Sequence, residues 1–292
     1  MLLGQAEVQS YKENGYIFIE DQFSRAEIEQ MRAELPGIFA EEGPHKVMEK
    51  DGRTVRSVYG SHTSNEFFRQ LVRSDKVLEP AQQLVDSDLY TYQFKINAKA
   101  AFGGDLWEWH QDFIFWHKED GMPEPRVTNA VVFLDDVNEV NGPLFLVPGS
   151  HHEGLIDPFA ADNDKNERAL GLDAYRASPS WISNLTADLK YSLKQPAVAW
   201  LIERYGVVSC KGKSGSVLFF HPNVVHGSGN NMSPFNRTLI LVTYNSTTNV
   251  PHFPEKRRPE FLASSDCKPL AVMSSDHSIP VLAAHAGDRR SA

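Results

Sequence analysis

The sequence predicts a mainly β protein, an all-β sandwich or barrel to which helices are added. Many short apolar segments separated by turn residues are typical of sandwiches and barrels, and a section with helical spacing precedes them. The chain has 292 residues, of which 41% are hydrophobic and 23% are charged, so it can bury a substantial core. We therefore expect one domain over 1–292, with insertions.

The N-terminal section, 1–87, is predicted to be helical packing support. Ser24 and Glu27 form a capping-box pattern that begins a helix, and Pro36 with Gly37 should end or kink that helix. The other elements predicted here are a helix over 6–14, strands over 16–19 and 55–60, and two short helices over 65–85.

The core is predicted over 88–248, with an insertion over 153–213 and an irregular tail over 249–292. Its predicted strands cover 89–101, 128–134, 144–147, 215–220 and 237–245, with a hairpin signal at Asn141-Gly142. The strand over 89–101 alternates between an apolar and a polar face. The polar face is either solvated or lines a ligand-binding interior, and we favour the interior. The insertion is interpreted as a cover across the barrel mouth that acts as a mobile lid.

Composition excludes several classes of function. The net charge of -9 argues against nucleic-acid binding, which depends on clustered Lys and Arg. The short basic run Lys256 to Arg258 is interpreted as solvated surface. No segment approaches the roughly twenty apolar residues of a membrane span, so neither a nucleic-acid nor a membrane partner is expected.

Cysteine usage and the N-terminus indicate a reducing, cytoplasmic setting. Cys210 and Cys267 are far apart and form no Cys-x-x-Cys pattern, so neither a disulfide scaffold nor a thiolate zinc site is expected. No basic segment followed by a sustained apolar run marks a secretory signal. The sequence indicates no particular oligomeric state.

The segment 106–126 carries the most informative pattern, His110-x-Asp112 amid five aromatic residues. In an extended strand, residues two apart point to the same face, so the imidazole and the carboxylate would lie together. A second histidine would complete the two-His-one-carboxylate set that leaves an open face on Fe(II). An isolated His-x-Asp pair is a weak signal, so the identity of the second histidine matters.

We expect His226 to be that histidine. It follows an apolar strand and precedes Gly-Ser-Gly, small residues that let a ligand approach the backbone. Arg237 begins the next strand, where a hairpin return would bring it beside His226, and its guanidinium could hold a carboxylate with two hydrogen bonds. The alternative ligands nearby are His117, His151, His152 and His221.

The pattern His110-x-Asp112, His226 and Arg237 resembles that of the Fe(II)- and 2-oxoglutarate-dependent dioxygenases of the phytanoyl-CoA hydroxylase-like superfamily. Within it, most of the chain, about 16–270, resembles the bacterial L-proline trans-4-hydroxylases. The segments that carry this resemblance are QFKINAK, WHQDFIFW, EDGM, NGPLFLVPGSH, VHGSGNNMSP, VTYN and RPEFLA. Ectoine hydroxylases are similar too, but they have Arg and Ser where this chain has Lys95 and Phe94.

The resemblance implies a double-stranded β-helix core, also called a jelly roll or cupin-like fold, with Fe(II), 2-oxoglutarate and O2 as cofactor and cosubstrates. The implied roles are Fe(II) binding by His110, Asp112 and His226, 2-oxoglutarate binding by Arg237, Ser228, Asn97 and Asn129, and substrate binding by Gln93, Lys95 and Trp116. Lys95 would pair with a substrate carboxylate; the alternative is a solvated lysine. Trp116 shares the strand parity of the ligands and would face the site if the strand persists. The alternative is core packing.

The implied reaction is hydroxylation of a free cyclic amino acid, with 2-oxoglutarate converted to succinate and CO2. L-Proline to trans-4-hydroxy-L-proline is the first expectation, and ectoine or another small amino acid is the alternative. Asp112 agrees with hydroxylation, because related halogenases carry a small residue at that place. A non-catalytic jelly-roll binding protein and a zinc hydrolase are the rival classes, since two histidines and one carboxylate also bind catalytic zinc.

Overall fold

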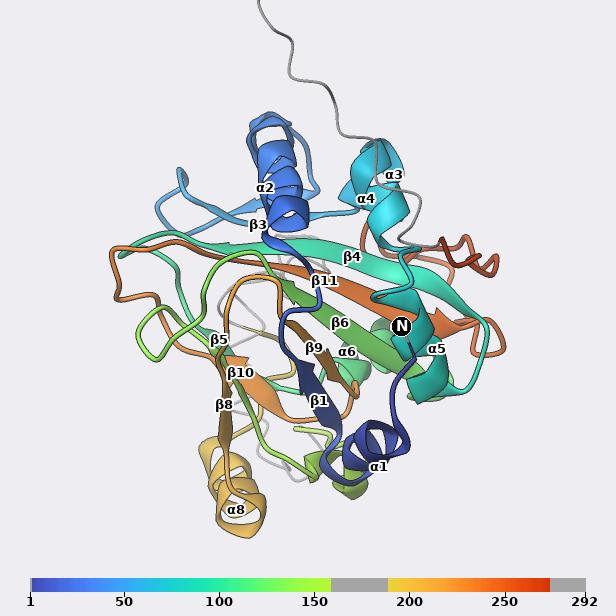
Figure 1. Cartoon of the computed structure of the whole chain (residues 1–292). Coiled ribbons are helices and arrows are strands. Elements are labelled where there is room, and N and C mark those ends of the chain that lie inside the picture. Colours follow the sequence, from blue (N-terminus) through green and yellow to red (C-terminus); the bar gives the residue numbers. More distant parts are fainter. Residues whose placement is uncertain (1, 159–188, 274–292) are drawn as a thin grey trace, which may run out of the picture.

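Two antiparallel sheets form the centre of the computed structural model, which describes residues 2–158 and 189–273 (Figure 1). The large sheet contains, in spatial order, β1 (Tyr16–Ile19), β9 (Val217–Phe220), β6 (Val127–Phe133), β11 (Arg237–Ser246), β4 (Leu89–Lys99), β3 (Val55–Tyr59) and β2 (Lys46–Met48). The small sheet contains β5 (Trp107–His110), β10 (His226–Ser228), β7 (Leu144–Leu146) and β8 (Val208–Cys210). This arrangement confirms the predicted mainly β class and is the double-stranded β-helix that the resemblance implied.

Helices lie around the two sheets. They are α1 (Gln5–Asn14), α2 (Arg25–Ala40), α3 (Ser61–Ser64), α4 (Glu66–Leu71), α5 (Leu78–Val85), α6 (Phe113–Asp120), the 3-10 turn η1 (Ser150–Glu153) and α8 (Gln195–Tyr205). Ser24 caps α2 and shares the predicted capping box with Glu27. The expected end of this helix at Pro36 is wrong. Ile38 is buried in the core, and its burial favours continuation despite the interior proline.

Strand β6 of the large sheet is apolar on both faces, and each face packs against a different layer. Val131 and Phe133 of β6 point towards the small sheet and pack with Leu146. Ala130 and Val132 point the other way, into the core formed with α2, α4 and α5. Figure 1 shows α2, α3 and α4 together on one side of β3 and β4. The interior between the two sheets is therefore separate from the helix-covered core.

A β-bulge changes the predicted alternation of β4. As expected, Phe94 faces the helices and Gln93 faces the interior. The pairing with β11 shifts between Thr243 and Tyr244, and beyond it Tyr92 packs with the aromatic residues of the interior. A bulge inserts one unpaired residue, so side chains beyond it exchange faces. The regular alternation predicted over 89–101, which would place Tyr92 on the same face as Phe94, is therefore wrong at this point.

Two predicted hairpins do not form. The strands that flank Asn141-Gly142, β6 and β7, belong to different sheets, and so do β10 and β11. Successive strands in this region cross between the sheets, whereas a hairpin requires that neighbours in sequence pair with each other. Gly142 is nevertheless a turn residue, with a φ of 77°.

The predicted insertion over 153–213 contains part of the small sheet. Helix α8 lies within it, and β8 pairs with β7. Its central part, 159–188, lies outside the described residues, so the structure does not test the expectation of a mobile lid there. No helix in the described part of the chain has the length and apolar character needed to cross a bilayer.

Candidate active site

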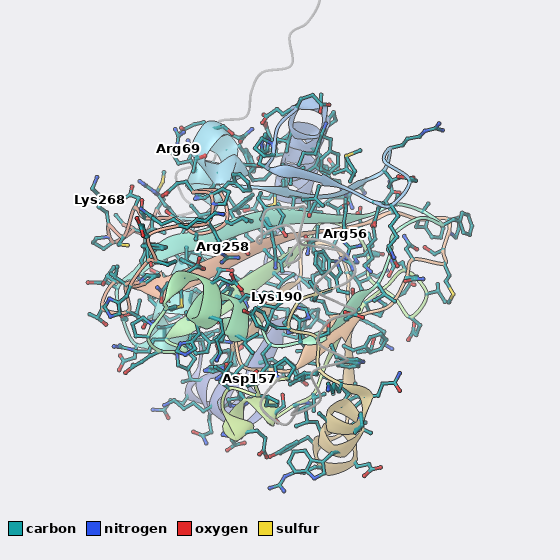
Figure 2. All side chains as sticks on the ribbon, turned by 180° about the vertical axis from the view of Figure 1, so that it is seen from behind. Arg56, Arg69, Asp157, Lys190, Arg258 and Lys268 are labelled. Carbon is teal, nitrogen blue, oxygen red and sulfur yellow. The ribbon has the colours of Figure 1, made fainter. Side chains whose placement is uncertain are left out.

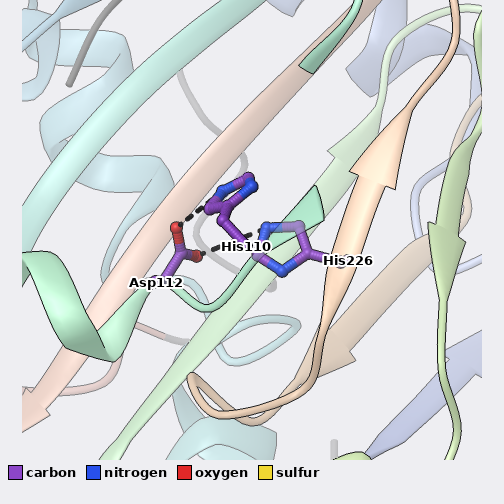
Figure 3. A group of neighbouring side chains, drawn as sticks. All are labelled: His110, Asp112 and His226. Atoms are coloured by element: carbon purple, nitrogen blue, oxygen red, sulfur yellow. Dashed lines mark ion pairs between the residues drawn. The ribbon is translucent and has the colours of Figure 1, made fainter. Parts of the chain in front are cut away.

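His110, Asp112 and His226 meet in the interior, as Figure 3 shows. One ligand atom from each lies within 4.8 Å of the other two, and the three residues are buried. The Nε2 of His110 is 3.6 Å from Oδ1 of Asp112, and the Nε2 of His226 is 3.8 Å from Oδ2. Among the described residues this is the one group of His, Cys, Asp or Glu with metal-binding geometry. The predicted convergence of the three side chains is confirmed.

The backbone that brings them together differs from the prediction. Strand β5 ends at His110, and Asp112 already has helical dihedral angles as the residue before α6. The two side chains therefore converge across a strand-to-helix junction and do not share one face of a strand. His226 arrives from the neighbouring strand, since it pairs with His110 in the register of β10 and β5.

Both imidazoles are oriented for metal binding. The Nδ1 of His110 is 2.6 Å from the carbonyl oxygen of Glu108, and that of His226 is 3.0 Å from the carbonyl oxygen of Val224. A Nδ1–H that donates to a carbonyl leaves Nε2 unprotonated and able to bind a metal. Burial, together with the neighbouring His110, lowers the pKa of His226 to about 3, so its ring is neutral at physiological pH.

The Asp112 carboxylate is charged. Burial alone would raise its pKa, but Lys95, His226 and His110 outweigh burial and hold that pKa below its usual range. Two imidazoles and one carboxylate form the ligand set typical of non-haem Fe(II) oxygenases, and they fit this ion.

Three of the four residues predicted to bind 2-oxoglutarate line the cavity beside the metal ligands. Arg237, which is 1% exposed, reaches it from β11, and Ser228 and Asn97 reach it from β10 and β4. Ser228 Oγ and Asn97 Oδ1 are buried there without a hydrogen-bond partner. Buried polar atoms are normally paired, so these two atoms indicate a polar ligand or water.

Arg237 is held in place by the Gly142 carbonyl. Its Nε and Nη2 donate to this oxygen at 3.1 and 2.7 Å. Burial lowers the pKa of Arg237 to about 9, because the nearby Asp135 offsets only part of the cost of burying the charge. The remaining N–H groups of this side chain are available to an anion in the cavity.

Asn129 does not line this cavity as the other three residues do. It lies behind Asp112 and donates from Nδ2 to Asp112 Oδ2 at 2.9 Å. Its Oδ1 accepts a hydrogen bond from Thr243 at 2.7 Å. Both the NH2 and the oxygen of the Asn129 amide therefore have partners within the protein. This arrangement does not support direct contact between Asn129 and 2-oxoglutarate.

The three predicted substrate residues, Gln93, Lys95 and Trp116, all line the cavity. Lys95 is partly buried, and its charge acts on the nearby Asp112. Its pairing with a substrate carboxylate stays a prediction, and so does the alternative of a solvated lysine. Trp116 reaches the cavity from α6 and packs edge-on against Tyr92. Its position is as predicted, but a helix places it there, not a persisting strand.

Arg258 is a cavity residue that the sequence analysis missed. The basic run containing it was interpreted as solvated surface, which is wrong for this residue, because Arg258 is 8% exposed and lines the cavity. Arg258, which is labelled in Figure 2, donates from Nε to Asp120 at 2.8 Å, and its Nη2 also contacts this carboxylate. Asp120 lies 138 residues earlier in the chain, so no local signal could have indicated the pair.

The alternative histidine ligands lie elsewhere. His151, His152 and His221 pack their rings together near α1, and two of them contact carbonyls of that helix. His117 on α6 contacts the Met122 carbonyl. None belongs to the metal-ligand group that the described residues form.

Comparison with known proteins agrees with this geometry. Residues 11–239 match the family described as phytanoyl-CoA dioxygenase. The chain is 36% identical to L-proline trans-4-hydroxylase of Streptomyces griseoviridis, over 91% of this chain and 94% of that protein. It is 34% identical to ectoine dioxygenase of Bordetella bronchiseptica, over 90% and 82%.

Solved structures show the same fold around a comparable centre. EctD from S. alaskensis with 2-oxoglutarate and 5-hydroxyectoine superimposes with a TM-score of 0.76 at 27% identity, covering 93% of this chain and 88% of that one. EctD with bound Fe gives 0.75 at 26% identity, with the same coverage. The extent of these matches favours a dioxygenase over the two rival classes, and the chain belongs to the phytanoyl-CoA dioxygenase family.

Proposed function

We propose that this enzyme hydroxylates L-proline to trans-4-hydroxy-L-proline, using Fe(II), O2 and 2-oxoglutarate, which is converted to succinate and CO2. The observation that carries the proposal is that the metal ligands and the unneutralised guanidinium of Arg237 open onto one cavity. When bound, Fe(II) supplies the activation of O2 that organic side chains cannot provide. The protein supplies the positions of the reactants.

The cosubstrate is assigned to the Arg237 end of the cavity. A dicarboxylate there receives charge-assisted hydrogen bonds from the guanidinium, and it satisfies the free atoms of Ser228 and Asn97. The opposite end of the 2-oxoglutarate molecule then lies towards His110 and His226. This arrangement supports 2-oxoglutarate over a monocarboxylate, which could not reach both ends.

The amino-acid substrate is assigned to the part of the cavity lined by Gln93, Lys95, Trp116 and Arg258. A free amino acid carries a carboxylate that needs a cationic partner away from water. Lys95 offers an ammonium at the wall of the cavity, near Asp112, and Trp116 offers an apolar wall for a ring. The C–H held nearest the metal reacts, so these residues set the regiochemistry.

Ectoine hydroxylation is the alternative, because ectoine dioxygenases are nearly as similar as the proline enzyme. Both substrates are small and cyclic and carry one carboxylate, so the same cation could serve either. L-Proline and ectoine differ in the shape and polarity of their rings. The ring is expected to contact the wall of the cavity and not the cation that binds the carboxylate.

The test is a substrate comparison with purified enzyme, Fe(II) and 2-oxoglutarate. We expect succinate to form in proportion to a hydroxylated product with L-proline, identified by NMR as the trans-4 isomer, and much less with ectoine. A higher kcat/KM for ectoine would replace the proposed substrate with the alternative. Succinate formation by iron-loaded enzyme that neither substrate stimulates would overturn both assignments.

His110→Ala and Asp112→Ala serve as controls for this test. Each removes one metal ligand, and we expect both variants to form neither succinate nor hydroxylated product. Product formation by either variant would show that the assay measures a different centre.

A further inference from the structure

Asp112 is held by a chain of two hydrogen bonds that begins on the large sheet. Thr243 of β11 and Asn129 of β6 are directly opposite each other in the register of these strands. Thr243 Oγ1 donates to Asn129 Oδ1 at 2.7 Å, and Asn129 Nδ2 donates to Asp112 Oδ2 at 2.9 Å. Thr243 is 1% exposed and Asn129 is fully buried, so water does not compete for these bonds.

The direction of this chain is fixed by its last member. A charged carboxylate can only accept, so the amide NH2 of Asn129 faces Asp112. The amide oxygen then faces Thr243, whose hydroxyl donates to it. If the amide were reversed, its oxygen would face a charged carboxylate, and two acceptors would meet in a buried place.

Asp112 needs this external support because of where it lies in the backbone. It follows the last residue of β5 and precedes α6, and as the cap of that helix it makes no side-chain hydrogen bond to the helix backbone. Neither a strand ladder nor a capping interaction fixes its carboxylate. The Asn129 bond to Oδ2 restricts rotation of the carboxylate and leaves Oδ1 free on the side facing His110.

We propose that Asn129, oriented by Thr243, is a positioning residue that presents Asp112 to the metal and sets the affinity of the centre. This role rests on the proposed use of a metal at this centre, but not on which amino acid is hydroxylated. It also replaces the role in 2-oxoglutarate binding that the sequence analysis gave to Asn129. Hydrogen-bond partners of metal ligands typically contribute a factor of about 10 to 100 in metal affinity.

The test is a titration of metal-free protein with Fe(II) under anaerobic conditions, or with Co(II) as a spectroscopic substitute. Asn129→Leu keeps the approximate shape and removes the amide, so we expect metal binding to weaken about 10- to 100-fold. Thr243→Val removes only the hydroxyl, and we expect a smaller loss in the same direction. Thr238→Val, on the same strand but outside this chain of bonds, is the matched control and should bind metal as the unmodified protein does.

The double variant Asn129→Leu/Thr243→Val separates positioning from general damage. If Thr243 acts through Asn129, the double variant binds metal as weakly as Asn129→Leu alone, because the second change has nothing left to affect. Additive losses, or metal affinity unchanged in Asn129→Leu, would overturn the proposal. Thermal unfolding of the metal-free variants identifies a loss caused by misfolding, and in that case Asn129→Ser provides a second, smaller amide deletion.

The outcome is independent of the substrate assignment. Weakened metal binding together with no activity on L-proline would retain this inference and reject the proposed substrate. Unchanged metal binding in Asn129→Leu together with hydroxylation of L-proline would reject this inference and retain the proposed substrate.

Discussion

Two buried arginines line the same cavity, and they are held in different ways. Arg237 donates to a neutral backbone oxygen, that of Gly142, and burial lowers its pKa to about 9. Arg258 pairs with the Asp120 carboxylate. Burial alone would lower the pKa of Arg258, but Tyr92 and Asp120 outweigh burial and raise it. Within the described residues, the charge of Arg237 therefore has no carboxylate partner in contact, whereas that of Arg258 is neutralised.

This difference indicates which of the two arginines binds an anionic ligand. Burying an unpaired charge is costly, and a protein that retains one at a cavity gains when an anion binds there. Arg258 already has its anion, so its contribution is to the shape and polarity of the cavity wall. The comparison predicts opposite effects when the two sites are disturbed, on stability at Arg258 and on cosubstrate binding at Arg237.

The largest effect is expected from Asp120→Asn. It leaves the guanidinium of Arg258 without an anion in a buried place, and breaking such a pair typically costs about 3–5 kcal/mol of unfolding free energy. Urea unfolding measures this loss. The double variant Asp120→Asn/Arg258→Met should recover part of it, because neither charge is then left alone. Stability unchanged in Asp120→Asn would mean that the pair is not structural.

Arg237→Met should affect cosubstrate binding and not stability, the reverse of Asp120→Asn. It removes a charge that is unpaired in the free protein, so the unfolding free energy should stay the same or rise. The KM for 2-oxoglutarate should rise roughly 100-fold, since hydrogen bonds to a charged group contribute about 1.5–3 kcal/mol. Arg258→Met is the matched control, destabilised but with less effect on this KM. Normal 2-oxoglutarate affinity in Arg237→Met would refute the assignment of the cosubstrate.

A smaller effect is expected from Gly142→Ala. This change disturbs the carbonyl that accepts the hydrogen bonds of Arg237 and leaves the arginine itself in place. Gly142 has a φ of 77°, and an added Cβ would lie 2.7 Å from the Gly229 carbonyl oxygen and 2.8 Å from Cδ of Lys99. The turn must shift, and the carbonyl that orients Arg237 shifts with it. We expect the KM for 2-oxoglutarate to rise roughly 10-fold, or about 1.4 kcal/mol, with kcat changed less. Gly154→Ala, another turn glycine whose Cβ would have open space, is the control.

The contrast between the arginines also shows what the sequence could and could not predict. Arg237 was found because it begins an apolar strand and follows His226 at short range. Arg258 was not, since it lies in an irregular segment and its partner is 138 residues away. A charged residue without periodic surroundings carries no signal of burial, because burial there depends on a tertiary contact.

The backbone at the metal ligands shows the same limit. The run Phe113 to Trp116 is apolar throughout, so its periodicity cannot distinguish a strand from a helix. The ligands were nevertheless predicted correctly, because their chemistry is specific even where the local conformation is not. The interior polar face of β4 was predicted from alternation, but the bulge opposite Thr243 was not, since nothing in the strand itself marks one.

The last prediction is a slope with pH and concerns Lys99, a second basic side chain near Arg237. Lys99 is 2% exposed, and its Nζ donates to the carbonyls of Asp105 and Gly229, both at 2.6 Å. Burial, together with Arg237 and Arg56, lowers the pKa of Lys99 to about 6. A neutral amine can still make both hydrogen bonds, and it leaves Arg237 as the charged member of the two.

The sign of the pH dependence follows from proton binding. The pKa of lysine in the unfolded chain is about 10.4, so between that value and the folded pKa the unfolded state binds the additional proton. The unfolding free energy should therefore rise with pH from about 6 upwards, with a contribution from this group of at most about 1.4 kcal/mol per pH unit. Urea unfolding at several pH values should show a shallower rise in Lys99→Met, whereas the exposed Lys50→Met should keep the original slope. Equal slopes in all three proteins would mean that Lys99 stays charged in the folded protein.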